Sequence, residues 1–375
     1  MKNKTLKLGL IAAVGCWCGA VCALDESTYD WYFGDKLPLE GNGFTVVDET
    51  DRYLRIPKRN WQKAPKSVLG AARHSTGMLV RFRSDARRLA VKWQLKKGMI
   101  VDPLIPPAGM QGLDVYELVR EGEWRFRGNK RYQLSGFKAP TNGVAAAEFS
   151  WTPGKTGLVY LPTRGEIVDF RVGVEKGKSF AFAPHAKGHE KPVVHYGTSI
   201  VHGGCASRPG LTFTAICGRL IDRPYVNLGF SGVGRMEIEM ADILAETDAE
   251  LYVVDCVWNM GRDKGALIRE RTIPFLKRLH ELRPETPILL CEGCNSGEER
   301  LASNDVLKAE YEKLLAVDSS ATRWLNYFPE EEMLVRGDYE QTHDFCHPND
   351  HGSLILGPAY ARRIDRILGG KEIEQ

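Results

Sequence analysis

The sequence lacks an excess of charge of either sign. It carries 51 Lys and Arg against 48 Asp and Glu, a formal net charge of +3 over 375 residues. The first 23 residues contain three lysines and no acid, so the rest of the chain has no formal net charge. Proteins that bind nucleic acid usually present a strongly basic surface. The composition therefore argues against a nucleic-acid partner.

Long hydrophobic runs are also missing. The stretch Leu8–Ala23 has 16 uncharged residues, whereas a membrane-spanning helix needs about 20. It follows three lysines and ends in the small-residue sequence VCA, which is typical of a signal-peptide cleavage site. We therefore expect residues 1–23 to be a signal peptide and the protein to be secreted or periplasmic, without stable membrane insertion. Lipoprotein anchoring at Cys16 is the alternative.

Cysteine is scarce outside this segment. Three of the nine cysteines lie in residues 1–23. The close pair Cys291-x-x-Cys294 supplies two ligands, whereas a structural zinc site needs four. The remaining cysteines are either disulfide-bonded or buried thiols, and a bridge between Cys205 and Cys346 is one option. Their pairing stays open at this point: Cys205, Cys217, Cys256, Cys291, Cys294 and Cys346.

Motifs for nucleotide binding are absent as well. The glycines of GFSGVG, at positions 229, 232 and 234, do not match the G-x-G-x-x-G spacing of a dinucleotide site, and no G-x-x-x-x-G-K-[ST] occurs. The segment GTSIV lacks the second glycine of the G-x-S-x-G nucleophile elbow. The sequence therefore predicts no cofactor and disfavours an α/β-hydrolase.

A histidine-rich segment, HDFCHPNDHG at residues 343–352, raises the question of a metal site. Its three histidines are four residues apart, as ligands on one helix would be, but Pro348 prevents a regular helix through them. We therefore predict no metal there. Asp350 is expected to cap the final helix.

Two different patterns divide the chain near residue 188. Before this point, short alternating apolar runs are separated by Gly, Pro, Asp and Asn. Period-two patterning of this kind is typical of an antiparallel sandwich. We predict a β-sandwich (jelly-roll-like) domain at residues 24–187 and a linker at residues 180–192. The runs that predict its strands are 77–95, 112–128, 146–153, 156–162 and 167–175.

Apolar strands alternate with helical patterns in residues 188–375. This alternation predicts a parallel sheet covered by helices on both faces. The predicted strands are 192–197, 224–229, 250–256, 287–292 and 323–327. The predicted helices are 211–222, 235–246, 264–283, 305–318 and a last one after residue 352.

Polar residues follow the ends of these strands, where parallel sheets place their functional sites. Ser199 follows the first strand, Gly232 the second and Asn259 the third, while Asp344 and His347 follow the fifth. A serine becomes a good nucleophile when an imidazole takes its proton and a carboxylate orients that imidazole. The backbone N–H groups of Ser199 and Gly232 and the amide of Asn259 are candidate oxyanion donors. The set predicts acyl transfer by a Ser199–His347–Asp344 triad.

The same residues carry a resemblance to a known family. In order and spacing they resemble the SGNH (GDSL-like) hydrolases, and GLDVY at residues 112–116 is similar to the Gly-x-Asp-Leu-Tyr signature of a β-sandwich domain that precedes one bacterial branch. The resemblance implies a flavodoxin-like three-layer α/β/α domain with the roles just given. Thr198 departs from the usual Asp and Val115 from the usual Leu. The matching segments are 197–199, 227–232, 259 and 344–349.

Three more residues are candidates for substrate binding. Trp258 replaces the glycine-rich approach to Asn259 and is expected to shape the pocket. Arg208 either binds substrate or pairs with a carboxylate, and His202 lies near Ser199 in the sequence. His195, by contrast, lies within a predicted strand and is expected to be a core residue.

The function expected from these features is that of an exported serine esterase acting on O-acyl, above all O-acetyl, esters of carbohydrate. The carbohydrate part rests on analogy with the family and not on any residue. A lipase or platelet-activating-factor-type acylhydrolase is one alternative. A carbohydrate-binding protein without catalytic activity is another.

Overall fold

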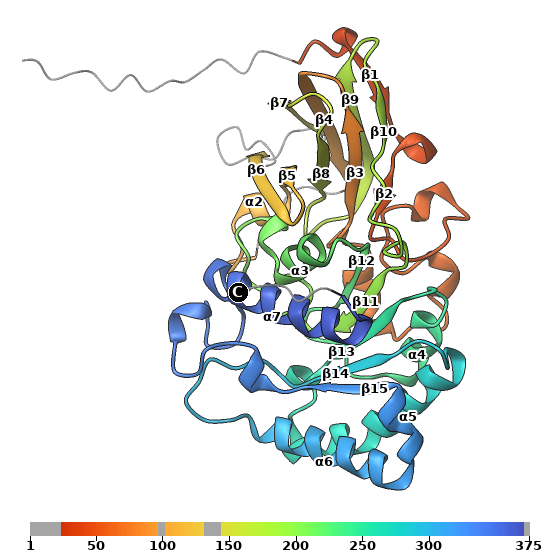
Figure 1. Ribbon diagram of the computed structural model, residues 1–375, viewed down its shortest axis with the longest axis vertical. Helices are drawn as coiled ribbons and strands as arrows, with labels where there is room; N and C mark the ends of the chain where they lie inside the picture. Colours follow the sequence, from red (N-terminus) through yellow and green to blue (C-terminus); the bar gives the residue numbers. More distant parts are fainter. Residues whose placement is uncertain (1–23, 97–101, 131–143, 371–375) are drawn as a thin grey trace, which may run out of the picture.

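The computed structural model describes residues 24–96, 102–130 and 144–370. The predicted signal peptide, including Cys16, lies outside the described residues. Figure 1 shows antiparallel strands stacked on a second part that contains a parallel sheet and its helices. Over the described ranges, no helix is long and apolar enough to cross a membrane.

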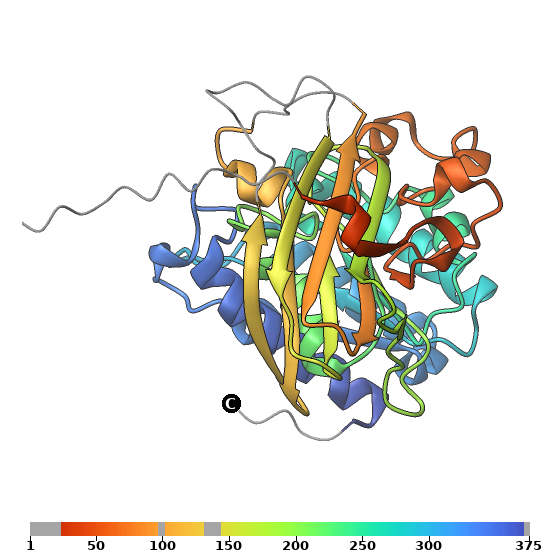
Figure 2. The same cartoon turned by 90° about the horizontal axis from the view of Figure 1, so that it is seen from above.

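Two antiparallel sheets form the N-terminal part (Figures 1 and 2). Their strand orders are β1-β9-β4-β7 and β10-β3-β8-β5-β6, with β2 paired to β3. Alternate side chains of the two sheets share one core, which includes Val80 and Phe82 of β3 and Val91 and Trp93 of β4. The predicted antiparallel sandwich is confirmed.

The strands of this part differ in length and in the length of the connections between them. Their bounds are β1 Tyr29–Tyr32, β2 Leu39–Glu40, β3 Leu79–Ser84, β4 Arg88–Leu95, β5 Leu113–Arg120, β6 Glu123–Lys130, β7 Val144–Ser150, β8 Thr156–Tyr160, β9 Ile167–Glu175 and β10 Phe180–Phe182. Two one-turn helices are α1 Leu69–Ala72 and α2 Pro107–Met110.

The C-terminal part is a five-stranded parallel sheet with helices on both faces, in the order β12-β11-β13-β14-β15. Successive residues of β11 face opposite layers: Val194 and Tyr196 pack with α4, α5 and α6, and Val193 packs with α3 and α7. This confirms the predicted three-layer α/β/α domain. The bounds are β11 Val193–Gly197, α3 Phe213–Ile221, β12 Tyr225–Gly229, α4 Ile238–Leu244, β13 Leu251–Asp255, α5 Ala266–Leu282, β14 Ile288–Cys291, α6 Ala302–Val317, β15 Leu325–Phe328 and α7 Asp350–Leu368.

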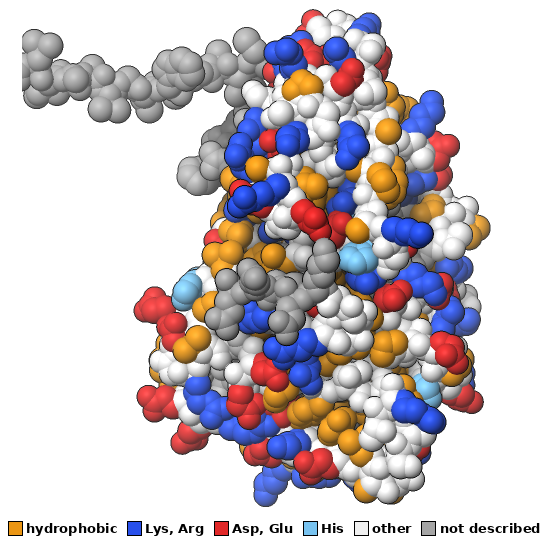
Figure 3. Space-filling model, viewed as in Figure 1, with side chains coloured by type: hydrophobic (Ala, Val, Ile, Leu, Met, Phe, Trp, Pro, Cys, Tyr) orange, Lys and Arg blue, Asp and Glu red, His pale blue; other side chains and the backbone are white. Residues whose placement is uncertain are grey.

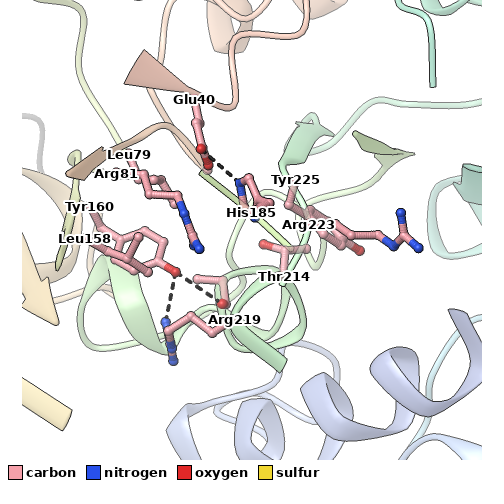
Figure 4. A pocket seen from close by; sticks show the side chains of 13 residues that line it. Glu40, Leu79, Arg81, Leu158, Tyr160, His185, Thr214, Arg219, Arg223 and Tyr225 are labelled. Carbon is pink, nitrogen blue, oxygen red and sulfur yellow. Dashed lines mark hydrogen bonds and ion pairs between the residues drawn. The ribbon is translucent and has the colours of Figure 1, made fainter. Parts of the chain in front are cut away.

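The predicted linker at residues 180–192 is wrong at its start. Phe180–Phe182 form β10, which pairs antiparallel with β3. His185 then joins a polar cluster between the two parts of the molecule, where it contacts Glu40 at 2.9 Å (Figure 4). It also contacts the carboxylate of Asp222 at 3.2 Å. The adjacent pocket, between β3, β8 and α3, has a volume of about 20 Å³, which is room for about one water molecule.

Side chains from before the predicted domain boundary near residue 188 pack against the part that follows it. The boundary itself stays a prediction. Side chains that precede β3 share a core with the parallel sheet and α4, among them Phe44, Ile56, Val68 and Ala72. The segment that carries them therefore belongs to the antiparallel part by sequence order and to the parallel part by packing.

The GLDVY segment contacts the loop that follows the first parallel strand. Asp114 is fully buried and accepts hydrogen bonds from Arg208 Nη1 at 2.8 Å and from the Gly210 N–H at 2.9 Å. Arg208 Nη1 also donates to the hydroxyl of Tyr116 at 2.6 Å. Since a Cβ at Gly210 would lie 2.3 Å from the Tyr116 ring, only glycine fits there. These contacts fix the antiparallel part against the parallel one.

Replacement of Asp114 by Ala is expected to lower the free energy of unfolding by about 3 kcal/mol, because Arg208 then loses its buried carboxylate partner. Denaturant unfolding measures this change. The matched control is Asp242→Ala, which removes a carboxylate from an exposed pair with Arg278 and is expected to cost less than about 1 kcal/mol. Equal losses in the two variants would contradict a special role for the Asp114 contact.

His185 is expected to make stability depend on pH. Burial alone lowers the pKa of His185, but hydrogen bonds to Asp222 and Glu40 outweigh it and raise that pKa from 6.5 to about 9. The folded protein thus holds the proton more tightly than the unfolded chain. The stabilisation is complete below about pH 6.5 and is lost as the pH rises through about 9.

Unfolding of wild type and His185→Gln at about pH 6 and about pH 9.5 measures this contribution. We expect wild type to be more stable by about 1–2 kcal/mol at the lower pH and the difference to shrink at the higher pH, after allowance for solvent screening. A difference that does not change with pH would rule out the charged His185.

Candidate active site

The turn that carries Ser199 lies at the carboxyl end of β11. His202 N–H donates to the Thr198 carbonyl at 3.0 Å and Gly204 N–H to the Ser199 carbonyl at 2.9 Å, so the turn is closed by its own backbone. It also packs directly on the end of β12. A Cβ at Gly229 would lie 2.1 Å from the His202 nitrogen, so this close approach requires glycine.

The structure brings the predicted triad together. Ser199 Oγ lies 2.7 Å from His347 Nε2, and His347 Nδ1 lies 2.8 Å from Asp344 Oδ2. Burial would raise the pKa of Asp344, but hydrogen bonds from the backbone N–H and ring of His347 outweigh it and hold that pKa below its ordinary value. The carboxylate is therefore charged at neutral pH and fixes the tautomer in which Nε2 accepts the serine proton.

The predicted oxyanion donors lie in the same pocket as Ser199 and His347. The backbone N–H groups of Ser199 and Gly232 have no hydrogen-bond acceptor among the described residues. Gly232 has a φ of 73°, and a Cβ there would meet no atom within 4 Å, so the space beside it is open. Asn259 donates one N–H of its side-chain amide to the Val233 carbonyl, which orients the amide and leaves its second N–H for a ligand.

The pocket around these groups has a volume of about 350 Å³. Trp258 lines it, as predicted, and its indole N–H is held by the Cys294 carbonyl at 2.8 Å. The antiparallel part contributes to the same pocket. Its lining residues from that part are Asp102, Leu104, Ile105 and Arg164, and those from the parallel part include Ser199, Cys205, Ser231, Gly232, Trp258, Asn259, Cys346 and His347.

Two predicted substrate-binding residues are not among the residues that line this pocket. Arg208 pairs with Asp114, which was the other interpretation of that residue. His202 is only 1% exposed and lies behind the loop that contains Gly232. Proximity to Ser199 in the sequence was misleading, because the turn directs His202 into the core.

His202 instead links the buried Arg55 to the loop that contains Ser231 and Gly232, which is called the oxyanion loop below. Arg55 Nη2 lies 3.2 Å from His202 Nε2, and since arginine only donates, Nε2 accepts this hydrogen bond. Nδ1 lies 2.9 Å from Ser231 Oγ, one residue before Gly232. Burial, together with Arg164 and Arg55, lowers the pKa of His202 well below its ordinary value, so the ring is neutral. Arg55 was not predicted, since no motif surrounds it in the sequence.

The remaining candidate residues from the sequence do not line the pocket of Ser199 and His347. His343 and His351 are exposed, and His195 is a buried core residue whose Nδ1 lies 2.8 Å from the Tyr225 hydroxyl. The prediction that Asp350 caps the final helix is wrong. Asn349 caps α7 by accepting from Gly352 N–H, and Asp350 binds the backbone and hydroxyl of Ser207.

The six cysteines in the described part of the chain are free thiols in this structure. Cys205 and Cys346 both line the pocket, and burial raises the pKa of Cys205 to about 12 and that of Cys346 to about 11. Both are therefore protonated at neutral pH. In the described residues, no group of three or more His, Cys, Asp or Glu side chains is arranged to hold a metal ion.

Comparison with family models gives two matches in the order of the chain. Residues 29–180 match the N-terminal domain of SGNH-hydrolase-type esterases, and residues 190–368 match the GDSL-like lipase/acylhydrolase family. The chain belongs to the GDSL-like lipase/acylhydrolase (SGNH) family. The Ser199–His347–Asp344 arrangement lies within the part that matches it.

Solved structures share this two-part architecture. A protein from Bacteroides ovatus described as a GDSL-like lipase is 26% identical, with a TM-score of 0.76 over 92% of this chain and 100% of that chain. The salicylyl-acyltransferase SsfX3 of a tetracycline biosynthetic pathway is 20% identical, with a TM-score of 0.70 over 91% and 98%. A family two carbohydrate esterase from Cellvibrio japonicus is 11% identical, with a TM-score of 0.58 over 91% and 98%. A comparison with curated proteins gives no match.

Replacement of Asn259 by Ala tests the oxyanion donors of this SGNH hydrolase. We expect kcat for a short acyl ester to fall about 10²-fold, with a smaller change in KM, because the amide acts on charge that develops in the transition state. Steady-state kinetics on 4-nitrophenyl acetate measures both constants, and a thermal melt checks that the variant is folded. An unchanged kcat in a folded variant would exclude Asn259 from the oxyanion hole.

Proposed function

We propose that this protein is an exported serine esterase that removes O-acyl groups, principally O-acetyl groups, from carbohydrate through an acyl-enzyme. The observation that carries the proposal is the continuous hydrogen-bonded path from Ser199 Oγ through His347 to Asp344 at the wall of an open pocket. The expected signal peptide at residues 1–23 is the basis for export.

The geometry provides each step of ester hydrolysis. Ser199 Oγ attacks the ester carbonyl while His347 Nε2 takes its proton. The N–H groups of Ser199 and Gly232 and the amide of Asn259 stabilise the resulting oxyanion. His347 then gives the proton to the departing alcohol, and the acyl group stays on Ser199. Water activated by the same imidazole releases the acid and restores the serine.

The carbohydrate substrate is supported by analogy and by the shape of the pocket. Among the similar structures, the protein from Cellvibrio japonicus is a family two carbohydrate esterase, and its chain aligns over both parts of the present one. The pocket, of about 350 Å³, lies between the two parts and is lined by polar groups as well as by Trp258, whose ring can stack on a sugar. A short acyl group and one sugar unit fit such a volume.

Acetate release from a panel of acetylated glycans, together with hydrolysis of 4-nitrophenyl esters of increasing acyl length, tests the proposal. We expect wild type to release acetate from at least one glycan and to prefer acetyl to long acyl groups. Ser199→Ala is expected to lower kcat at least about 10³-fold, because the covalent step is lost.

The panel also separates the alternatives. A preference for long acyl chains would replace the carbohydrate substrate by that of a lipase or a platelet-activating-factor-type acylhydrolase. Binding of glycans without release of acid from any ester would overturn the esterase and leave a carbohydrate-binding protein. Turnover that persists in Ser199→Ala would contradict the nucleophile.

A further inference from the structure

Arg164 brings a guanidinium from the antiparallel part into the pocket of Ser199. It follows β8 in the sequence, is only 6% exposed, and lines the pocket together with Ser199 and His347. Its Nη1 donates to the carbonyl oxygens of Thr163 and His202, each at 3.1 Å. These two backbone contacts fix the direction of the side chain.

The other two nitrogens of Arg164 are left without an acceptor. Nε and Nη2 make no hydrogen bond to the described residues, and neither is among the buried polar atoms that are sealed from solvent. Both atoms therefore keep some exposure to solvent, and the pocket of Ser199 is a cavity that Arg164 lines. Nε and Nη2 lie on one edge of the guanidinium, and this edge forms two parallel hydrogen bonds with a carboxylate.

Charge balance also favours an anion at this position. Among the described residues, no carboxylate lies within 4 Å of Arg164, whereas buried cations are normally paired. A second buried cation, Arg55, lies behind the same wall and makes its contacts to backbone carbonyls, Asn227 and His202. Arg55 does not line the pocket, so Arg164 is the buried cation that the pocket exposes to a ligand.

Asp102 is the acid that lines the same pocket. Its Oδ1 accepts from the Leu104 N–H at 3.0 Å, and its carboxylate acts on Arg164 only from beyond ion-pair distance. Burial lowers the pKa of Arg164 to about 10, with Asp102 opposing the shift, so the guanidinium stays charged at neutral pH. The carboxylate of Asp102 thus weakens the positive field in the pocket without occupying the free edge of Arg164.

We propose that Arg164 binds a carboxylate of the substrate, so that the preferred esters are anionic molecules. If the substrate is a carbohydrate, it is an O-acylated sugar acid such as a uronic acid. This inference rests on the proposed function and adds the charge of the substrate to it. The carboxylate belongs either to the sugar or to the acyl group, and the same guanidinium edge recognises both.

The test begins with wild-type enzyme and two matched pairs of esters. One pair is the same O-acetyl ester on methyl galacturonoside and on methyl galactoside. The other pair is 4-nitrophenyl hemisuccinate and 4-nitrophenyl butyrate. We expect kcat/KM to be about tenfold higher for the anionic member of one pair, mainly through KM, because charged hydrogen bonds form already in the bound substrate. The pair that responds tells which side of the ester carries the carboxylate.

Variants then assign the preference to Arg164. Arg164→Gln is expected to reduce the anionic-to-neutral ratio of kcat/KM about tenfold. Arg164→Lys is expected to restore part of this ratio, since lysine keeps the positive charge but lacks the paired N–H donors of the guanidinium. Asp102→Asn is expected to raise the ratio, because it removes the opposing charge. Arg73→Gln is the matched control: it removes the same charge from a guanidinium that pairs with Glu166 and is not among the pocket residues, and the ratio should not change.

Three outcomes would overturn the inference. If wild type hydrolyses the neutral and anionic members of both pairs equally, the inference is refuted and the esterase function is not. This result does not depend on the folding of any variant. A preference that survives in folded Arg164→Gln would assign the carboxylate to another group. Failure to hydrolyse any ester would refute the proposed function itself and the inference with it.

Discussion

The assembly of the site depends on one buried guanidinium. Arg55 donates to the Gly229 carbonyl at the end of β12 at 2.5 Å, to the Ala71 carbonyl at 2.6 Å and to the His74 carbonyl at 3.1 Å, and it also reaches His202. It therefore ties the segment before β3 to the strand that leads into the oxyanion loop and to the turn that carries Ser199. A charge buried in this way is tolerated because its donors meet acceptors on every side.

This constraint explains why the two parts of the chain act as one unit. The carboxyl ends of the parallel strands supply Ser199, Gly232, Asn259 and His347, but the pocket they form is completed by Arg164 and its neighbours from the antiparallel part. Asp114 also joins the two parts, through hydrogen bonds from Arg208 and Gly210. The GLDVY segment is thus a contact between the two parts.

Figure 3 shows basic and acidic side chains interspersed over the visible face, which fits the near-neutral composition. Recognition of a charged group therefore has to come from the pocket itself rather than from a surface field that steers ligands from a distance. The free edge of Arg164 is such a local feature.

The sequence predicted the structural features that depend on local patterns of apolar and polar residues. Apolar runs of period two and the strand–helix alternation located both sheets, and the placement of Ser199 and His347 followed because parallel strands end on one edge. Residues whose roles depend on long-range packing were missed or misplaced. Arg55 and Arg164 lie in segments without any motif, His202 turns away from the pocket it precedes, and the strand Phe180–Phe182 lies in a segment that its prolines and glycine made look like a linker.

Covalent trapping tests the central claim most directly. Wild-type protein is mixed with a slowly turned-over 4-nitrophenyl ester, quenched in acid and digested, and the acylated peptide is identified by mass spectrometry. The account predicts one acyl group, on Ser199, and none in a Ser199→Ala sample treated in the same way. An acyl group on another residue, or turnover without any acyl-enzyme on Ser199 under conditions where deacylation is slow, would contradict it.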